Sequence, residues 1–112
     1  MYEISYYSPT QKSSPIENFL ESLNPIQEAK VIRAFTYLKE FGLTNSIPNL
    51  RKLAGTPLWE LRILGKDNIR IICTSRKVNE IVILHIFIKG KRKTPTRELN
   101  LAINRYKSVV DR

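Results

Sequence analysis

The sequence contains one cysteine, one histidine and four glycines, and it has no long apolar run. The lone Cys73 has no partner for an internal disulfide, and its apolar surroundings predict a buried structural thiol in a reducing compartment. No stretch approaches the roughly 18 apolar residues that a membrane span needs, and the first residues lack the pattern of a secretory signal. We therefore expect a cytoplasmic protein without a membrane segment.

Metal chemistry is also disfavoured by the composition. The chain offers a single histidine, His85, no pair of cysteines and no cluster of acids. Metal sites in proteins usually combine several such ligands at close spacing. We expect neither a metal ion nor any other cofactor.

Positive charge is what the chain has in excess. It carries 19 Lys+Arg against 10 Asp+Glu, a formal net charge of +9. Residues 1–40 hold only four of the bases and five of the acids, so the excess lies in the rest of the chain. Such a field attracts polyanions, but by itself it does not distinguish RNA from DNA or from an acidic protein.

Length and patterning predict a single α+β domain over residues 1–112. Ser14-Pro15, Asn24-Pro25 and Thr94-Pro95 each combine an N-cap with a proline at the first helical position, and Gly42 ends the second helix. Strand-like runs lie at 2–6, 50–53, 58–64, 69–75 and 80–88. The expected order is β-α-α-β-β-β-β-α, an N-terminal helical hairpin packed on a mainly antiparallel twisted β-sheet, with a C-terminal helix.

Helical spacing predicts which helix faces are buried. In the second helix the apolar stripe consists of Ile26, Ala29, Ile32, Phe35 and Leu38, joined by Val31 and Ala34. In the last helix it consists of Leu99, Ala102, Ile103, Tyr106 and Val110.

Alternate residues of a strand face opposite sides of a sheet. Trp59, Leu61 and Ile63 then share the core side, and a wholly apolar face is predicted for Val82, Leu84, Ile86 and Ile88. The other side should display Glu60, Arg62, Arg70, His85 and Lys89. Neighbouring arginines repel each other in a purely structural sheet, so their pairing is unfavourable there. A bound anion makes the same pairing favourable. The alternative is a solvated surface on which Glu60 bridges the two arginines.

His85 and the basic turn after it are further candidates. His85 is the only side chain whose ordinary pKa, about 6.5, allows easy proton exchange near neutral pH, although a hydrogen-bonded structural role is the alternative. The segment 89–95 reads Lys-Gly-Lys-Arg-Lys-Thr-Pro and precedes a helix N-terminus. Backbone N–H groups and the helix dipole favour phosphate there, the alternative being a solvated basic turn.

These residues form a pattern that resembles the RelE/ParE superfamily of bacterial toxins, most closely its HigB-like, phage-derived branch. The matching segments run from Arg51 to Ile63, including Gly55-Thr56-Pro57-Leu58-Trp59-Glu60-Leu61-Arg62, then over Arg70-Ile71-Ile72 and 83–89, and into Lys93-Thr94-Pro95 and Glu98. Their order and spacing match over nearly the whole chain.

The resemblance implies a RelE-like fold and the toxin of a type II toxin–antitoxin system. Such a toxin is a ribosome-dependent mRNA endonuclease, or mRNA interferase, that cuts the codon in the decoding site and inhibits translation. The implied partners are mRNA, the ribosome and a cognate antitoxin with a helix-turn-helix domain.

The implied site residues are basic. The resemblance maps them onto Arg62, Arg70 and Lys89, with Lys91 or Arg92 as a looser match. No tyrosine stands at Glu98 or Leu99, where some relatives carry one in the last helix, so the general base is not identified by the resemblance. We expect a metal-independent endoribonuclease with Arg62, Arg70, His85 and Lys89 as catalytic residues and Lys52, Lys91, Arg92 and Lys93 as RNA contacts.

In that chemistry a ribose 2′-OH attacks the adjacent phosphorus, and preorganised arginines stabilise the added negative charge. The proton carrier is expected to be His85 or a lysine, either Lys89 or Lys91, and Phe87 either stacks on a base or packs in the core. Two other functions remain open: ParE-like inhibition of DNA gyrase without hydrolysis, and RNA binding without cleavage.

Overall fold

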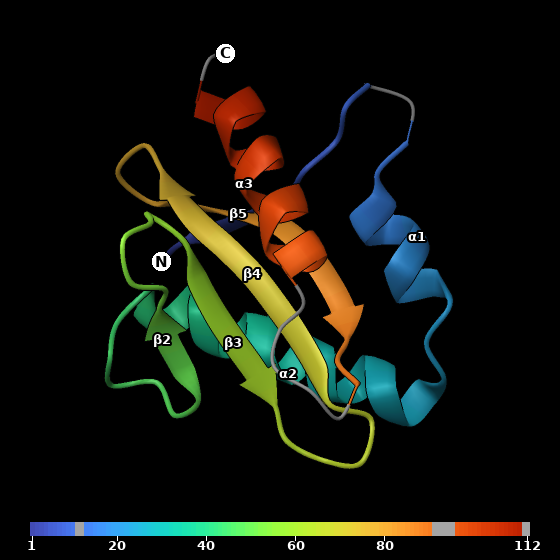
Figure 1. The fold of residues 1–112 in the computed structure, drawn as a ribbon. Helices are drawn as coiled ribbons and strands as arrows, with labels where there is room; N and C mark the ends of the chain where they lie inside the picture. Colours follow the sequence, from blue (N-terminus) through green and yellow to red (C-terminus); the bar gives the residue numbers. More distant parts are fainter. Residues whose placement is uncertain (11–12, 91–95, 111–112) are drawn as a thin grey trace.

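The computed structural model describes residues 1–10, 13–90 and 96–110. Its elements are β1 (Glu3–Tyr6), α1 (Pro15–Glu21), α2 (Pro25–Phe41), β2 (Leu50–Lys52), β3 (Trp59–Ile63), β4 (Ile69–Arg76), β5 (Glu80–Ile88) and α3 (Thr96–Val110). The order predicted from the sequence is confirmed, and the fold is α+β (Figure 1). The predicted cap at Thr94-Pro95 and the predicted RNA contacts Lys91, Arg92 and Lys93 lie outside the described residues.

The five strands form one mixed sheet in the order β1-β5-β4-β3-β2. Among the strands of the described residues, only β1 and β5 pair in parallel, and the other three pairings are antiparallel. The tight turn between β3 and β4 relies on positive φ angles at Gly65 (137°) and Asn68 (56°), two residue types that tolerate this region. The resulting register sets Arg62 directly opposite Arg70, on the shared face that strand parity predicted.

The helices lie on both sides of the sheet (Figure 1). Helices α1 and α2 cover one face, where a core cluster of 13 buried residues includes Leu61, Ile71, Cys73 and Ile83. Helix α3 crosses the other face over a smaller cluster of seven buried residues. Cys73 is buried and free, as predicted, and burial raises the pKa of its thiol to about 12.

The N-terminal caps follow the sequence closely. Ser14 Oγ accepts hydrogen bonds from the N–H groups of Ile16 and Glu17, and Asn24 forms a reciprocal capping box with Gln27. Gly42 ends α2 with φ 75°, and a Cβ there would lie 2.5 Å from a ring carbon of Tyr2. Only glycine fits this close approach, which joins the end of α2 to the N-terminal strand.

The predicted helix stripes were partly wrong. Helix α2 buries Val31, Phe35 and Leu38, whereas Ile26 and Ile32 are 70% and 54% exposed. A helix packs only one face against a sheet, and the face centred on the row 31, 35 and 38 excludes the row 26, 29 and 32. Helix α3 buries Ala102 and Val109, with Leu99, Ile103 and Tyr106 packed beside them, while Val110 is exposed.

A β-bulge overturns the predicted face of β5. Ile72 pairs with His85 and Cys73 with Ile83, so Leu84 is the extra residue. Val82 and Leu84 therefore pack under α3, whereas Ile86 packs under α1 and α2. The bulge shifts the alternation of side chains by one residue after Leu84. His85 therefore lies on the α3 side although Ile83, two residues earlier, lies on the other side.

Candidate functional site

Two rows of paired residues cross the α3 side of the sheet. One row runs Arg51, Glu60, Ile72, His85, and the next runs Arg62, Arg70, Phe87. Directly paired residues share a face, and the two rows are about 7 Å apart along the strands. Beyond them, towards the other end of the strands, the same face becomes the apolar cluster under α3. The predicted polar group is therefore brought together on one face.

Glu60 and Arg70 are nevertheless buried rather than displayed, which corrects the predicted solvent-facing surface. Glu60 is 0% and Arg70 6% exposed. A Glu60 carboxylate oxygen lies 3.4 Å from Arg70 Nη1 and 3.5 Å from Arg51 Nη2. Glu60 thus bridges Arg70 and Arg51, not Arg70 and Arg62, because Arg51 is its cross-strand partner. A buried carboxylate needs such partners to offset its lost hydration.

Arg70 is held by polar contacts on two sides. Its Nη2 donates to Asn68 Oδ1 at 3.4 Å, and the Asn68 carbonyl oxygen accepts from the Lys89 N–H at 2.9 Å. Asn68 therefore sets the backbone of Lys89 beside Arg70. Within the described residues Arg70 Nε is buried without a hydrogen-bond partner. The Arg70 guanidinium is therefore held in one orientation by Glu60 and Asn68.

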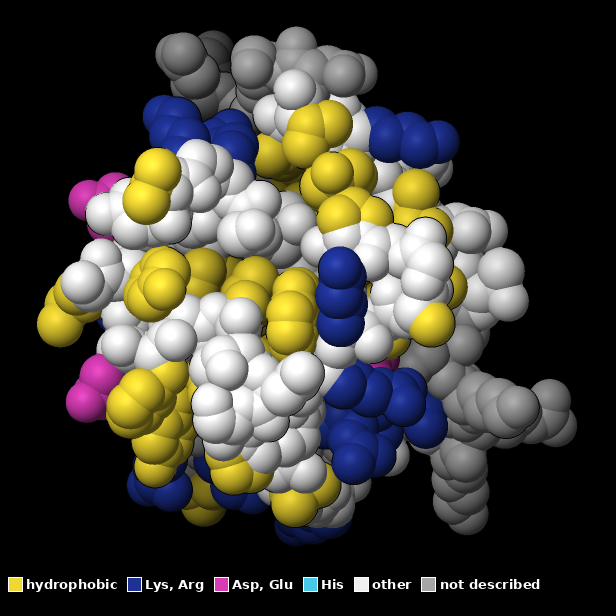
Figure 2. Space-filling model, turned by 90° about the vertical axis from the view of Figure 1, so that its left-hand side faces the viewer, with side chains coloured by type: hydrophobic (Ala, Val, Ile, Leu, Met, Phe, Trp, Pro, Cys, Tyr) yellow, Lys and Arg dark blue, Asp and Glu magenta, His cyan; other side chains and the backbone are white. Residues whose placement is uncertain are grey.

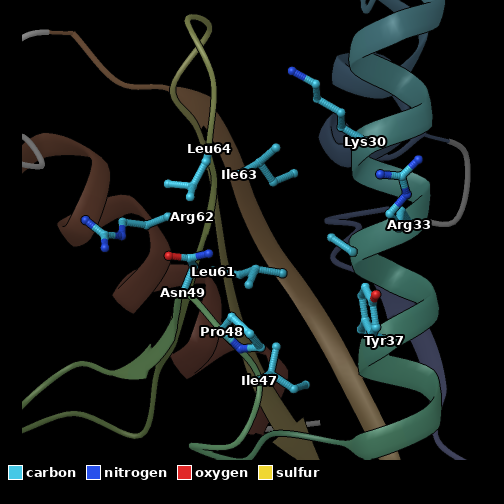
Figure 3. A pocket seen from close by; sticks show the side chains of 11 residues that line it. Lys30, Arg33, Tyr37, Ile47, Pro48, Asn49, Leu61, Arg62, Ile63 and Leu64 are labelled. Atoms are coloured by element: carbon cyan, nitrogen blue, oxygen red, sulfur yellow. The ribbon is translucent and has the colours of Figure 1, made fainter.

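Arg62 is an exposed cation of this face, like Arg51, but Arg51 is paired with Glu60. Its N–H donates to the Asn49 carbonyl oxygen at 3.0 Å, which anchors the backbone, and no acid pairs with its side chain in the part of the chain that the structure describes. Figure 3 shows this side chain directed away from α2. In Figure 2 lysine and arginine side chains gather at the lower right, on the side of the sheet that α3 covers. Arg62 is free to meet an anion.

His85 lies in a network with α3. Its Nε2 is 3.3 Å from both carboxylate oxygens of Glu98, and its Nδ1 is 3.3 Å from Arg105 Nη1. The ring stacks on Phe87 with centroids 5.2 Å apart. Since arginine only donates, Nδ1 must accept, and the proton of the neutral ring sits on Nε2 facing Glu98.

The charge state of His85 follows from the same surroundings. Burial lowers the pKa of His85 most, Glu98 raises it, and Arg105 lowers it, with a net shift below the ordinary value. The ring is therefore neutral at pH 7. Both ring nitrogens are occupied by Glu98 and Arg105, so the proton acceptor that remains in this network is the Glu98 carboxylate.

Sequence reasoning missed Glu98 and Arg105 as members of the site. Arg105 Nη1 also donates to the Leu84 carbonyl oxygen at 2.8 Å, and its guanidinium lies 5.0 Å from the centre of the Tyr7 ring. Burial lowers the pKa of Arg105. The available signal was spacing, since Glu98, Ala102 and Arg105 fall on one helical face. Only apolar residues were used to predict that face.

Two predicted residues stand apart from the two rows. Lys52 pairs with Trp59, whose ring packs on the core under α1 and α2, so Lys52 lies on the other face from Arg62. Its neighbour Arg51, which pairs with Glu60, lies on the face of the two rows instead. Lys89 follows the last residue of β5 and is partly buried beside Asn68.

The described part of the chain contains neither a metal-binding cluster nor a membrane-spanning helix. Among residues 1–10, 13–90 and 96–110 no group of three or more His, Cys, Asp or Glu residues is placed to hold a metal ion. Over the same residues no helix combines the length and apolar character that crossing a bilayer requires.

Comparison with known proteins assigns a family. The family model of Phage derived protein Gp49-like (DUF891) matches residues 18–107, a range that contains both charged rows and the His85 network. No curated protein matches the sequence. Because the match covers most of the chain, the protein belongs to the Gp49-like family, a phage-derived, toxin-like family of toxin–antitoxin systems.

Proposed function

We propose that this protein is the toxin of a type II toxin–antitoxin system, of the HigB-like branch of the RelE/ParE superfamily, and that it is a metal-independent, ribosome-dependent mRNA endonuclease. The observation that carries the proposal is one sheet face on which an exposed arginine, Arg62, lies opposite a fixed one, Arg70, beside the His85–Glu98 pair. Membership of a toxin-like family supports it.

The reaction consists of one displacement at phosphorus. The ribose 2′ oxygen loses its proton to a base and bonds to phosphorus, and the bond from phosphorus to the 5′ oxygen breaks. That oxygen takes a proton from an acid, leaving a 2′,3′-cyclic phosphate and a 5′-hydroxyl. Each proton transfer contributes about 10²–10⁴-fold, and stabilisation of the phosphorane charge contributes the larger share.

The residues divide these roles by exposure and contact. Arg62 binds the scissile phosphate, because it is exposed and has no acidic partner among the described residues. Arg70, fixed by Glu60 and Asn68, contributes a preorganised positive charge behind it. The Glu98 carboxylate takes the 2′ proton, oriented by the Nε2–H of His85. Lys89, at the end of β5, protonates the leaving oxygen.

The partners follow from this activity. The substrate is mRNA in the ribosomal decoding site, where the ribosome fixes the codon that the toxin cuts. A cognate antitoxin with a helix-turn-helix domain holds the toxin inactive. The net charge of +9 suits both the ribosome and an acidic antitoxin segment.

The test is to express the wild type and Arg62→Ala in matched cells and to map new RNA 5′ ends. We expect cuts within codons for the wild type and at least a hundredfold fewer for Arg62→Ala, with Lys39→Ala, on the exposed side of α2, as the matched control. Equal cutting by the wild type and by Arg62→Ala rejects the proposed site. Intact mRNA together with impaired DNA supercoiling identifies a gyrase inhibitor instead, and salt-sensitive RNA binding without any cut identifies a binding module.

A further inference from the structure

A groove of about 480 Å³ lies between α2 and the outer edge of β3, on the opposite side of the sheet from Arg70 and His85 (Figure 3). Its walls come from one face of α2, from the segment 47–49 and from the end of β3. Lys30, Arg33 and Tyr37 line it from α2, and Ile47, Leu61 and Leu64 line it from the other walls.

The groove leaves large apolar side chains in contact with water. Leu64 is 66% and Tyr37 50% exposed, while Ile47 and Leu61 form a buried floor at 7% and 4%. Figure 3 shows Leu61 and Ile63 directed towards α2 across the groove. In Figure 2, which faces the β2 and β3 edge, apolar side chains reach the surface across the middle of this side. Grouped exposed apolar surface of this kind marks interaction sites.

Among the described residues that line the groove, every charged one is a cation. Lys30 and Arg33 stand on the α2 wall, and Asp67 lies only in the adjoining turn. Lys30 Nζ lies over the turn after β3, where a Cβ added to Gly65 would be 2.9 Å from it. Asp67 in that turn makes no ion pair with Lys30. In the described chain neither Lys30 nor Arg33 has an acidic partner within salt-bridge distance. The groove therefore combines an apolar floor with unneutralised cations.

We propose that this groove binds an acidic amphipathic segment of a protein partner. An apolar stripe on that segment covers Tyr37 and Leu64, and carboxylates beside the stripe meet Lys30 and Arg33. The α2 residues of the wall span two helical turns, about 10 Å, which fits a partner helix lying alongside. RNA is disfavoured as the occupant, because its phosphates gain nothing from apolar walls and the Arg62 side chain faces the other side of the sheet.

The inference is independent of RNA cleavage, since its cations and the two charged rows lie on different faces of the sheet. The test is a titration of the ¹⁵N-labelled protein, followed by backbone NMR shifts. The probe is a designed helical peptide of about four turns with a leucine stripe flanked by glutamates, and the reference is the same peptide with lysines for the glutamates. We expect shifts that cluster on Ala34, Tyr37, Ile63 and Leu64 for the glutamate peptide only.

Charge reversal then tests the cations. The double variant Lys30→Glu and Arg33→Glu should weaken glutamate-peptide binding at least tenfold and bind the lysine peptide instead. The matched control is Lys39→Glu with Lys107→Glu, which makes the same change in net charge at exposed sites away from the groove. The spectra report folding of every variant. The proposal is overturned if the groove residues do not shift at millimolar peptide, if both peptides bind equally, or if single-stranded RNA shifts these residues more strongly than the peptide.

Discussion

The two faces of the sheet differ in the residues that lie buried under their helices. Under α1 and α2 the described sheet residues form an apolar core, whereas under α3 the core ends halfway and gives way to Glu60, Arg70 and the His85 network. Adjacent residues of β3 illustrate the contrast, since Leu61 packs in the first core and Glu60 is equally buried on the other side. Burial alone therefore does not separate core residues from members of the candidate site. The core residues are apolar, whereas the buried Glu60 and Arg70 are paired with each other.

The largest effect should come from removing the buried acid. Glu60→Ala leaves Arg70 buried without its carboxylate, and we expect a loss of about 3–5 kcal/mol in the free energy of unfolding. Urea unfolding followed by circular dichroism measures it. A double variant, Glu60→Leu with Arg70→Leu, should recover much of that loss because it removes both buried charges and leaves only the exposed Arg51 without Glu60. A Glu60→Ala protein as stable as the wild type would show that this face is not held by the ion pair.

The next largest effect separates activity from stability on the same strand. Arg62→Ala removes an exposed side chain, so unfolding free energy should change by no more than about 0.5 kcal/mol. Cleavage of mRNA should nevertheless fall by about 10²–10³-fold, which is about 2.7–4 kcal/mol of transition-state stabilisation. Parallel unfolding curves and 5′-end mapping give both numbers. A large loss of stability would remove the contrast with Glu60.

A smaller effect concerns the attachment of α3. Arg105→Lys keeps the charge but removes Nη1, which donates to the Leu84 carbonyl at 2.8 Å and lies 3.3 Å from His85 Nδ1. We expect a cost of about 1 kcal/mol in unfolding free energy, the usual contribution of one hydrogen bond. Arg97→Lys, on the exposed side of the same helix, is the control and should change nothing. A silent Arg105→Lys would show that the Tyr7 contact and the apolar cluster suffice to hold the helix.

The smallest effect is the pH dependence that His85 adds, because Glu98 partly offsets the influence of burial on its pKa. The folded-state pKa lies below the ordinary value of about 6.5, so the unfolded chain binds the proton more readily. The contribution of the neutral His85 ring to the free energy of unfolding is full above pH 6.5. It is lost as the pH falls from there towards the folded-state pKa. Unfolding between pH 8 and pH 5 should show a steeper loss for the wild type than for His85→Gln. Parallel profiles would contradict the neutral ring.

The order of the elements was readable from local signals. Ser14 and Asn24 each carry a side-chain oxygen that satisfies free N–H groups of the first turn, and the chain at Gly42 requires a positive φ. Alternation in β3 and β4 was enough to set Arg62 and Arg70 on one face. These features depend on residues close in sequence, which is why they were predicted correctly.

The site was predicted only in part, because its missing members come from far along the chain. Glu98 and Arg105 meet His85 across 13 and 20 residues, and their polar character disguised a helix face that packs on the sheet. The bulge at Leu84 has no local marker such as glycine, yet it decides the side on which His85 lies. The face of Lys52, which pairs with Trp59 away from Arg62, could not be predicted because pairing between β2 and β3 was unknown.

By itself the sequence determined the α+β order, the helix ends, the buried thiol of Cys73 and the positive charge of the chain, since each depends on local conformational preference or on composition. Tertiary structure decided which charges are buried, which arginine stays exposed and which nitrogen of His85 carries the proton. Those properties depend on cross-strand register and on the packing of α3, where desolvation and hydrogen bonding act between residues that no local pattern connects.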